Sequence, residues 1–205
     1  IRAVVDDAEQ GVVHVQAVGR EPRPVTRLAL IQALAKQGRD EEAIDAATQI
    51  GVDEVIPWQA DRSIVKWKDG KTNRKWGAVL DAVTEQSRRA WRPELADHVS
   101  SKGVLAICRR ACVHGGLVVV LHQDDDNDWN GVEQAVCELA DASLTDGRSR
   151  TVYVVVGPEG GISDNEAAAF KSAGAHVCVL GRNILRAATA GPVALSLLSR
   201  VLGRF

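Results

Sequence analysis

The chain has 205 residues, of which 45% are hydrophobic, and its formal net charge is −2. This length fits one domain, or one domain with part of another, and the composition is sufficient to bury a core. No apolar run approaches the roughly 18 to 20 residues of a membrane span, and no signal peptide opens the sequence, so we expect a cytoplasmic protein with no membrane partner.

The first 24 residues form a β-rich piece that is too short to fold alone. Residues 12–18 predict a strand, and residues 19–24 predict a linker that ends in Pro-x-Pro. The sequence begins at Ile1 and contains no methionine, so we expect it to be part of a longer product. We therefore interpret residues 1–24 as the tail of an N-terminal β domain and residues 25–205 as a second domain.

From residue 27 onward, strand and helix patterns alternate, which predicts an α/β fold with a parallel sheet. The expected strands are 27–34, 53–58, 117–121, 151–156 and 177–180, and the expected helices are 40–50, 73–89, 130–142, 164–173 and 187–202. We expect Asp40 and Asn130 to cap their helices and Pro57 to end its strand.

The stretch from Arg62 to Arg92 carries nine lysine or arginine residues and three acidic residues, with three tryptophans among them. Basic side chains beside flat aromatic ones suit an RNA backbone and its unstacked bases. A solvated helix face with half-buried tryptophans explains the pattern equally well. The residues that we assign to RNA contact are Arg62, Lys66, Lys68, Arg88, Arg89 and Arg92.

A glycine-rich loop at residues 157–161 follows the apolar strand 151–156 and leads directly into a helix. Ser163 and Glu166 have the spacing of a capping box, which fixes the start of that helix. The glycines thus lie at the carboxyl end of a strand, where open α/β sheets bind ligands. The loop lacks the dinucleotide fingerprint and the P-loop lysine, which argues against a phosphate cradle. A connection without a ligand remains the alternative.

A second loop of the same kind spans residues 180–190 and also joins a strand to a helix. Arg186 stands among apolar and small residues there, and an unpaired guanidinium is costly to bury, so it requires a partner or a substrate. Two such loops on neighbouring strands would form one cleft.

No metal site is predicted. The four cysteines (Cys108, Cys112, Cys137 and Cys178) form no CxxC pair, so we expect buried or idle thiols. The acidic run at residues 124–128 begins like a calcium-binding EF-hand loop, but Trp129 replaces the required glycine and Ala135 the required glutamate. A solvated loop is expected.

These blocks resemble the RsmE-type 16S ribosomal RNA uridine-N3 methyltransferases of the SPOUT, or trefoil-knot, superfamily. The matching residues are Gly157-Pro-Glu-Gly-Gly161, Leu180-Gly-x-x-Ile-Leu-Arg186-x-x-Thr-Ala190, residues 30–36, Ala47-Thr-x-x-Gly-Val52, Arg62-Ser63 and residues 85–89. The resemblance covers about residues 25–205. Relatives have a carboxylate where this chain has Ala188, which puts any role of that carboxylate in doubt here.

The resemblance implies a SPOUT-type parallel sheet with a C-terminal trefoil knot and a remnant of a PUA-like RNA-binding β-barrel at residues 1–24. It also implies a homodimer that acts on small-subunit ribosomal RNA within an assembled subunit. Its cofactor would be S-adenosylmethionine, held in the knot by Leu121, His122, Val156, Gly157, Pro158, Gly160, Gly161, Leu180, Gly181, Asn183, Ile184, Leu185, Thr189 and Ala190. The apolar last helix fits either a dimer surface or an ordinary core contact, and Pro192 is expected to mark its start.

Methylation of uracil N3 requires the loss of its proton. We expect Arg186 to stabilise the resulting negative charge on the carbonyl oxygens and Glu159, or else His122, to accept the proton. Glu159 has the alternative role of shaping its loop. Competing hypotheses are the same chemistry on another RNA such as tRNA, a non-catalytic RNA-binding module, and a nucleotide-dependent oxidoreductase, against which the missing dinucleotide fingerprint argues.

Overall fold

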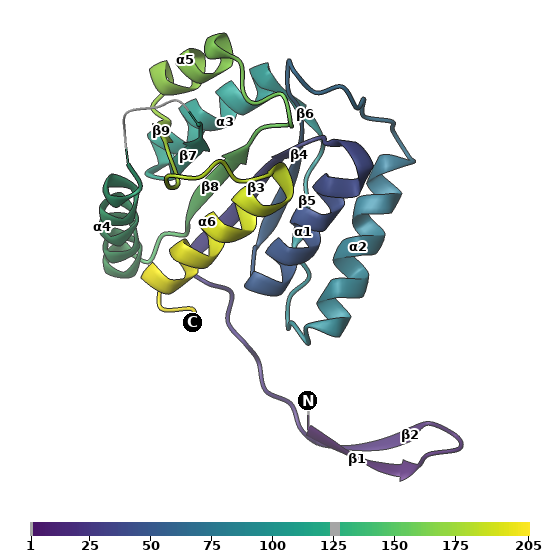
Figure 1. Cartoon of the computed structure of the whole chain (residues 1–205). Coiled ribbons are helices and arrows are strands. Elements are labelled where there is room, and N and C mark those ends of the chain that lie inside the picture. The colour runs from purple at the N-terminus through teal and green to yellow at the C-terminus, as the bar shows by residue number, and fades with distance from the viewer. Residues whose placement is uncertain (1, 124–127) are drawn as a thin grey trace.

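The computed structural model describes residues 2–123 and 128–205. Its main feature is a parallel sheet with strand order β5-β4-β3-β8-β7-β9, in which β6 also pairs with β4 (Figure 1). The strands are β3 (Thr26–Ala33), β4 (Glu54–Gln59), β5 (Glu94–Leu95), β6 (Val99–Ser100), β7 (Leu117–Leu121), β8 (Arg150–Val156) and β9 (His176–Cys178). The predicted α/β class and parallel sheet are confirmed.

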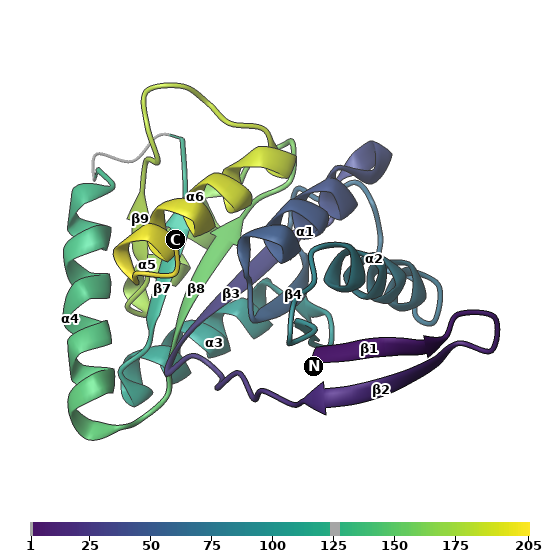
Figure 2. The ribbon, with the colours of Figure 1, turned by 90° about the horizontal axis from the view of Figure 1, so that it is seen from below.

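Helices cover both faces of this sheet. They are α1 (Arg39–Ile50), α2 (Thr72–Gln86), α3 (Ser101–His114), α4 (Asn130–Asp146), α5 (Asp164–Ser172) and α6 (Ala187–Val201), with a short 3-10 helix η1 (Lys36–Gly38). Alternate residues of β3 show why two layers form: Leu28 and Leu30 pack against α1, α4 and α6, whereas Ile31 and Ala33 face the core beneath α3 and α5 (Figure 2). Both faces of β3 are therefore buried, as expected of a central parallel strand.

The N-terminal residues form an antiparallel hairpin of β1 (Arg2–Asp7) and β2 (Val12–Ala17). The hairpin lies apart from the large sheet, to which residues 18–25 connect it (Figures 1 and 2). Its valines are exposed. The strand predicted at 12–18 is confirmed, and its relation to a PUA-like barrel stays a prediction.

Pro57 lies inside β4 and does not end it, so that prediction was wrong. The Val55 carbonyl accepts a hydrogen bond from the Ala96 N–H on the outer side of β4, and residues two apart in a strand direct their backbone groups alike. The N–H that proline lacks would therefore face outward, where β5 has ended and β6 has not begun. No sheet hydrogen bond is lost there, which explains why the strand continues.

Two predicted helix caps were also wrong. The residue before α1 is Gly38, in a left-handed conformation, so Asp40 lies in the first turn and is buried. The residue before α4 is Trp129, and the Asn130 side chain instead donates to Asp128 at 3.0 Å. Neither helix end has a side-chain cap.

Pro192 lies within α6 and does not mark its start. The Arg186 carbonyl accepts from the N–H groups of Thr189 and Ala190 at 2.8 and 2.9 Å, so the first turn closes before the proline is reached. The helix therefore begins beside the second predicted loop.

Within the described ranges 2–123 and 128–205, no helix is both long and apolar enough to cross a membrane. Residues 124–127 of the acidic run that the sequence indicates to be a solvated loop lie outside the described residues.

Candidate functional site

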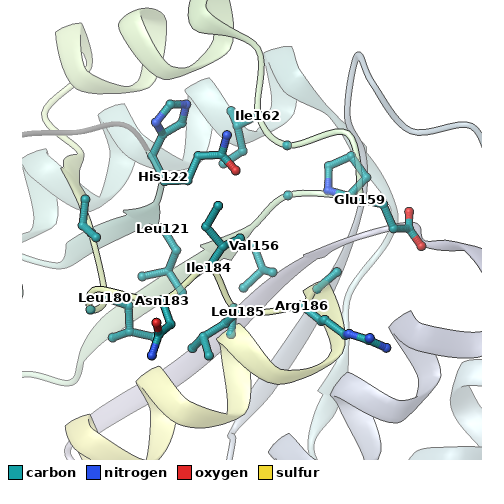
Figure 3. A pocket seen from close by; sticks show the side chains of 18 of the residues that line it. Leu121, His122, Val156, Glu159, Ile162, Leu180, Asn183, Ile184, Leu185 and Arg186 are labelled. Atoms are coloured by element: carbon teal, nitrogen blue, oxygen red, sulfur yellow. The ribbon is translucent and has the colours of Figure 1, made fainter.

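A cavity of about 630 Å³ opens at the carboxyl ends of β7, β8 and β9. Figure 3 shows that three chain segments form most of its walls: the end of β7, the loop after β8, and the loop between β9 and α6. Both loops predicted to form a cleft therefore do meet at one cavity, as the rule for parallel sheets requires.

Most of the residues that the sequence assigns to a cofactor line this cavity. They are Leu121, His122, Val156, Gly157, Pro158, Gly161, Leu180, Gly181, Asn183, Ile184, Leu185 and Ala190. Gly160 and Thr189 are absent from the lining. Gly160 instead lies against Arg62, and Thr189 is exposed on α6. Glu159 and Arg186 both border the cavity.

The loop after β8 depends on glycine at two positions. A Cβ at Gly157 would lie 2.7 Å from the Ile162 side chain, so only glycine lets the chain turn back this tightly. Gly161 has a φ of 71° and donates its N–H to the Pro158 carbonyl at 2.8 Å. The glycines therefore shape a tight turn whose backbone faces the cavity.

The opposite wall, residues 180–185, offers unused backbone groups. Among the described residues, none forms a hydrogen bond with the backbone of this segment. Backbone N–H and C=O groups are strong donors and acceptors that normally find partners. Apolar side chains stand beside them, including Leu185 and Ile184, which is 77% exposed. This wall can bind a ligand that has both an apolar ring and polar edges.

The Glu159 carboxylate accepts a hydrogen bond from the Lys36 N–H at 2.8 Å. Lys36 lies in η1, which follows β3, so this contact joins the loop after β8 to the loop after β3. Figure 3 shows the Glu159 side chain directed away from Leu121 and His122. The geometry favours the loop-shaping role that the sequence left as an alternative.

Arg186 is the residue immediately before α6, and its side chain is exposed. Its guanidinium has neither a hydrogen bond nor an ion pair with any residue that the structure describes. The expected cost of burying this charge therefore does not arise, and the guanidinium remains available to a substrate.

A buried carboxylate anchors the helix after the glycine loop. Glu166 is 4% exposed, and the predicted capping box with Ser163 is present. Glu166 also accepts hydrogen bonds from the Asp61 N–H at 2.9 Å and from the Ser101 hydroxyl. Burial alone would raise the pKa of Glu166, but these hydrogen bonds outweigh it and lower the pKa. The group is thus charged and holds three segments together.

The sequence assigned Arg62 to RNA contact. In the structure it borders the cavity and forms hydrogen bonds with the glycine-rich loop at residues 157–161 and with Ile162. Its Nη1 donates to the Gly160 carbonyl at 3.2 Å and to the Ile162 carbonyl at 3.4 Å. Arg39, Gln123, Arg182 and Asp164 also line the cavity and were missed in the sequence. Arg39 follows the carboxyl end of β3, so the strand-end rule was the signal that pointed to it.

The other predicted RNA-contact residues fall into two groups. Lys66 and Lys68 follow β4 and lie at the cavity end of the sheet, whereas Arg88, Arg89 and Arg92 follow α2. Arg89 donates to the Thr48 carbonyl at 2.9 Å, and Arg92 pairs with Asp81. The side chains of Lys66, Lys68 and Arg88 form no hydrogen bond or ion pair with any described residue.

The tryptophans near these residues are mostly engaged in packing. Trp76 is fully buried, and Trp67 stacks on His98 with ring centroids 5.1 Å apart. Trp91 lies under the Arg23 guanidinium at 4.9 Å. Trp67 therefore fits the alternative interpretation, in which half-buried tryptophans pack against the protein, better than a role in stacking on RNA bases.

Cys108, Cys112 and Cys137 are free thiols, and burial raises the pKa of Cys108 to about 11. Cys112 and Cys137 are exposed on different helices. Across the described ranges, no group of three or more histidine, cysteine or acidic side chains is placed to hold a metal ion.

The chain is similar to known proteins of one family. Residues 21–199 match the family model of the RNA methyltransferase domain. The ribosomal RNA small subunit methyltransferase E of Mycobacterium tuberculosis is 32% identical over 209 residues, which cover all of this chain and 75% of that protein. The enzyme of the same name from Bacillus subtilis is 30% identical over 176 residues. The match covers 84% of this chain and 65% of that protein.

A solved structure described as a methyltransferase from Legionella pneumophila, in complex with the cofactor SAM, superimposes with a TM-score of 0.67. It is 28% identical and covers 85% of this chain and 66% of that one.

Proposed function

Because the chain belongs to the RsmE-type RNA methyltransferase family, we propose that it uses S-adenosylmethionine (SAM) to methylate N3 of a uridine in small-subunit ribosomal RNA. The observation that carries this proposal is the cavity between the two strand-end loops. The Arg186 guanidinium, which has no partner among the described residues, lies at its border. Membership of the family supports methylation of ribosomal RNA. That the methylated atom is N3 of a uridine is our more specific proposal.

The cavity fits the cofactor chemically. Leu121, Val156 and Leu185 offer apolar contact to an adenine ring. The backbone of residues 180–185, which is without partners in the described ranges, suits the polar edges of adenine and ribose. A volume of about 630 Å³ is within the range of small-molecule sites, roughly 300–1,000 Å³. When bound, SAM supplies a methyl group made electrophilic by its sulfonium. The two loops hold and orient it, and alignment is most of what such a displacement requires.

Arg186 is proposed to act on the uracil. The N3 proton of uracil must leave before or during methylation, and negative charge then develops on the neighbouring carbonyl oxygens. An unpaired guanidinium at the cavity border can donate to those oxygens and stabilise that charge. Its available donors make Arg186 the leading candidate for the catalytic residue.

Glu159 is proposed to hold its loop in place, because its carboxylate already accepts the Lys36 N–H. Its role as the proton acceptor remains the alternative, with His122, which borders the cavity, as the other candidate. The two roles of Glu159 predict different pH–rate profiles, since only a proton acceptor imposes its own ionisation on the profile.

The resemblance to the family also implies a topology, an oligomeric state and a location for this chain. We propose a trefoil knot in the C-terminal half, a homodimer, a PUA-like origin for residues 1–24 and activity in the cytoplasm. The half-buried Val193, Leu197 and Val201 on α6 leave an apolar strip for a second copy, while Leu198 faces the core. Light scattering after gel filtration tests the dimer.

The deciding experiment is methyl transfer from radiolabelled SAM to three substrates: assembled small subunits, free 16S RNA and tRNA. We expect labelling of the assembled subunits, with 3-methyluridine identified by mass spectrometry. Preferential labelling of tRNA, or a methyl group on another atom, would reject the substrate or the position. If no RNA is labelled and calorimetry detects no SAM binding, the molecule is a non-catalytic module.

A further inference from the structure

Two contacts join the glycine loop to the segment that follows β4. Arg62 Nη1 donates to the carbonyls of Gly160 and Ile162 at 3.2 and 3.4 Å. Next to it, the Asp61 N–H donates to the Glu166 carboxylate at 2.9 Å. The segment after β4 donates both interactions: a side chain donates to the loop backbone, and the backbone next to it donates to a side chain of α5. The two segments are thus joined at two adjacent residues.

The position of Arg62 along the loop is specific. The two carbonyls that it bonds flank Gly161, the residue with a φ of 71°. A Cβ at Gly160 would lie 3.2 Å from the Arg62 Cβ, so the loop also packs closely on this side chain. One guanidinium nitrogen therefore bonds to the loop on both sides of Gly161.

Such a brace is needed because the loop has little internal support. Glycine loses more conformational freedom on ordering than any other residue. Within the turn itself, the backbone hydrogen bond among described residues is that from Gly161 to Pro158. A loop that is ordered before ligand binding avoids the entropy cost of ordering it during binding.

We propose that Arg62 is a positioning residue for the cofactor: anchored through Asp61 and Glu166, its guanidinium holds residues 157–162 in the shape that receives SAM. This inference rests on the proposed function, and it moves Arg62 from the RNA-contact set to the cofactor site. Lys66, four residues further along and exposed, retains the role of RNA contact.

Three variants test the proposal: R62Q, which removes the charge at similar size; R62K, which retains one charged donor; and K66Q, a matched control on the same segment. SAM affinity is measured by calorimetry. We expect R62Q to raise the Kd for SAM about tenfold, R62K to give a smaller increase, and K66Q to leave it unchanged. Because the effect is on binding, KM for SAM rises while kcat at saturating SAM is retained.

A second measurement uses the ligand-free protein. Hydrogen exchange of the peptide spanning 157–163 should be faster in R62Q than in the unaltered protein and unchanged in K66Q. Thermal unfolding identifies any variant that fails to fold, in which case R62K carries the test. Equal SAM affinity and equal exchange in folded R62Q would overturn the inference. If the unaltered protein binds no SAM, the proposed function falls, and loop exchange still decides whether Arg62 braces the loop.

Discussion

At the scale of single residues, the charged side chains of the site divide into three that fix the loops and one, that of Arg186, that is exposed. Arg62, Glu159 and Glu166 all bond to backbone groups of neighbouring loops, whereas the Arg186 guanidinium bonds to no described residue. The charged groups nearest the cavity therefore serve different purposes, which their sequence neighbourhoods alone do not reveal.

The first prediction concerns Arg186. Arg186→Ala should lower kcat about 100-fold because the charge that develops on the uracil oxygens loses its donor. The Kd for SAM should change little, since the cofactor is proposed to lie on backbone groups. Steady-state kinetics with methyl-labelled SAM measures both constants. Arg109→Ala, which removes an exposed arginine of α3 outside the cavity, is the control. An unchanged kcat in the Arg186 variant contradicts the assignment.

The second prediction concerns Glu166 and pH. Its folded pKa lies below its ordinary value, so its charge adds stability above the unfolded pKa, and this contribution is lost as pH falls through the folded pKa. Glu166→Gln should therefore lower the unfolding free energy by about 2 kcal/mol at pH 7, where a charged acceptor is removed. The difference from the unaltered protein should shrink on acidification. Urea denaturation at pH 7 and at lower pH measures it, and a difference that grows in acid would contradict the mechanism.

The sequence predicts residues well where the partners are close along the chain. The Ser163–Glu166 capping box is confirmed because both members lie in one helical turn. The contacts of Arg62 and Glu159 were missed as such because they join residues about a hundred positions apart. The sequence shows that these side chains are charged. Which backbone groups they bond to depends on the order of the strands in the folded sheet.

At the scale of elements, close packing of α6 on the sheet brings its first turn to the cavity. A Cβ at Gly191 would lie 2.8 Å from the Leu30 side chain and 3.4 Å from that of Val156. Both neighbours are buried, so neither has much room to move. Glycine at this position is therefore a packing requirement.

The third prediction follows from this contact. Gly191→Ala should lower the unfolding free energy by about 1 kcal/mol, because overpacking outweighs the gain in helix propensity. Gly131→Ala in α4 is the matched control: nothing lies within 4 Å of its added Cβ, so it should stabilise the protein by about 0.5 kcal/mol. Thermal or urea unfolding compares them. If both substitutions stabilise the protein, the Leu30 side chain can move away from the added Cβ, and the prediction is contradicted.

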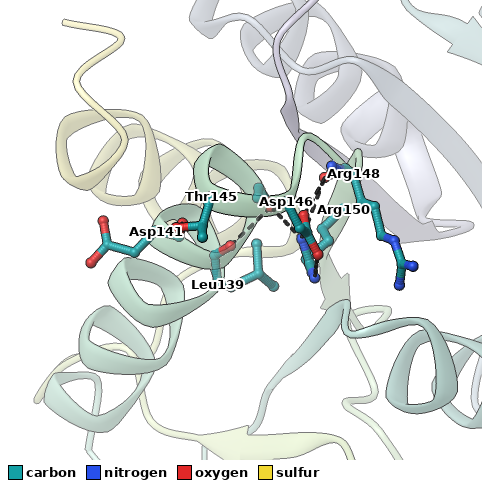
Figure 4. Close-up of polar contacts among 7 residues, drawn as sticks. Leu139, Asp141, Thr145, Asp146, Arg148 and Arg150 are labelled. Atoms are coloured by element: carbon teal, nitrogen blue, oxygen red, sulfur yellow. Dashed lines mark hydrogen bonds and ion pairs between the residues drawn. The ribbon is translucent and has the colours of Figure 1, made fainter.

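Local turn chemistry was readable at this scale. The dipeptide Asp146-Gly147 is typical of a turn, and it lies where α4 ends and the chain leads into β8. Gly147 has a φ of 67°. Figure 4 shows Asp146 accepting from the Arg148 N–H at 2.9 Å and from both Arg150 Nη atoms. The hydrogen bonds from Arg150 hold the pKa of Asp146 well below its usual value.

The helix α3 was missed, although its signal is present. Val104, Ile107, Cys108 and Ala111 recur at helical spacing and are all buried. Three exposed positively charged residues and a glycine interrupt the apolar pattern, and no residue at its start makes a side-chain cap. Tertiary burial against β4 and β7 supplies what the local sequence lacks.

At the scale of the whole molecule, the basic stretch that looks continuous in sequence is divided in space. Lys66 and Lys68 lie at the cavity end of the sheet, and α2, whose 15 residues span about 22 Å, separates them from Arg88. An RNA that enters the cavity would reach the lysines before the arginines. Sequence order suggested one stripe because it does not show that a helix carries the chain back along the sheet.

The fourth prediction tests this division. Lys66→Ala should weaken RNA binding and reduce the slope of log affinity against log salt by about one unit, as expected for one lost phosphate contact. Arg92→Ala should mainly reduce stability, since Arg92 pairs with Asp81 and donates to the Pro93 carbonyl. Filter binding over a salt series and thermal unfolding distinguish the two. A salt slope unchanged by Lys66→Ala would remove it from the interface.

The interrupted pairing around Pro57 has a consequence for how copies of the chain behave in concentrated solution. One border of the sheet is completed by β5 and β6, two strands of two residues each, and Pro57 of β4 lies opposite the gap between them. The other border is the three-residue β9. Neither border presents the long row of free donors and acceptors on which a foreign strand could assemble. The large sheet is thus blunted at both sides against amyloid-like growth, even though its central strands are among the most apolar segments in the protein.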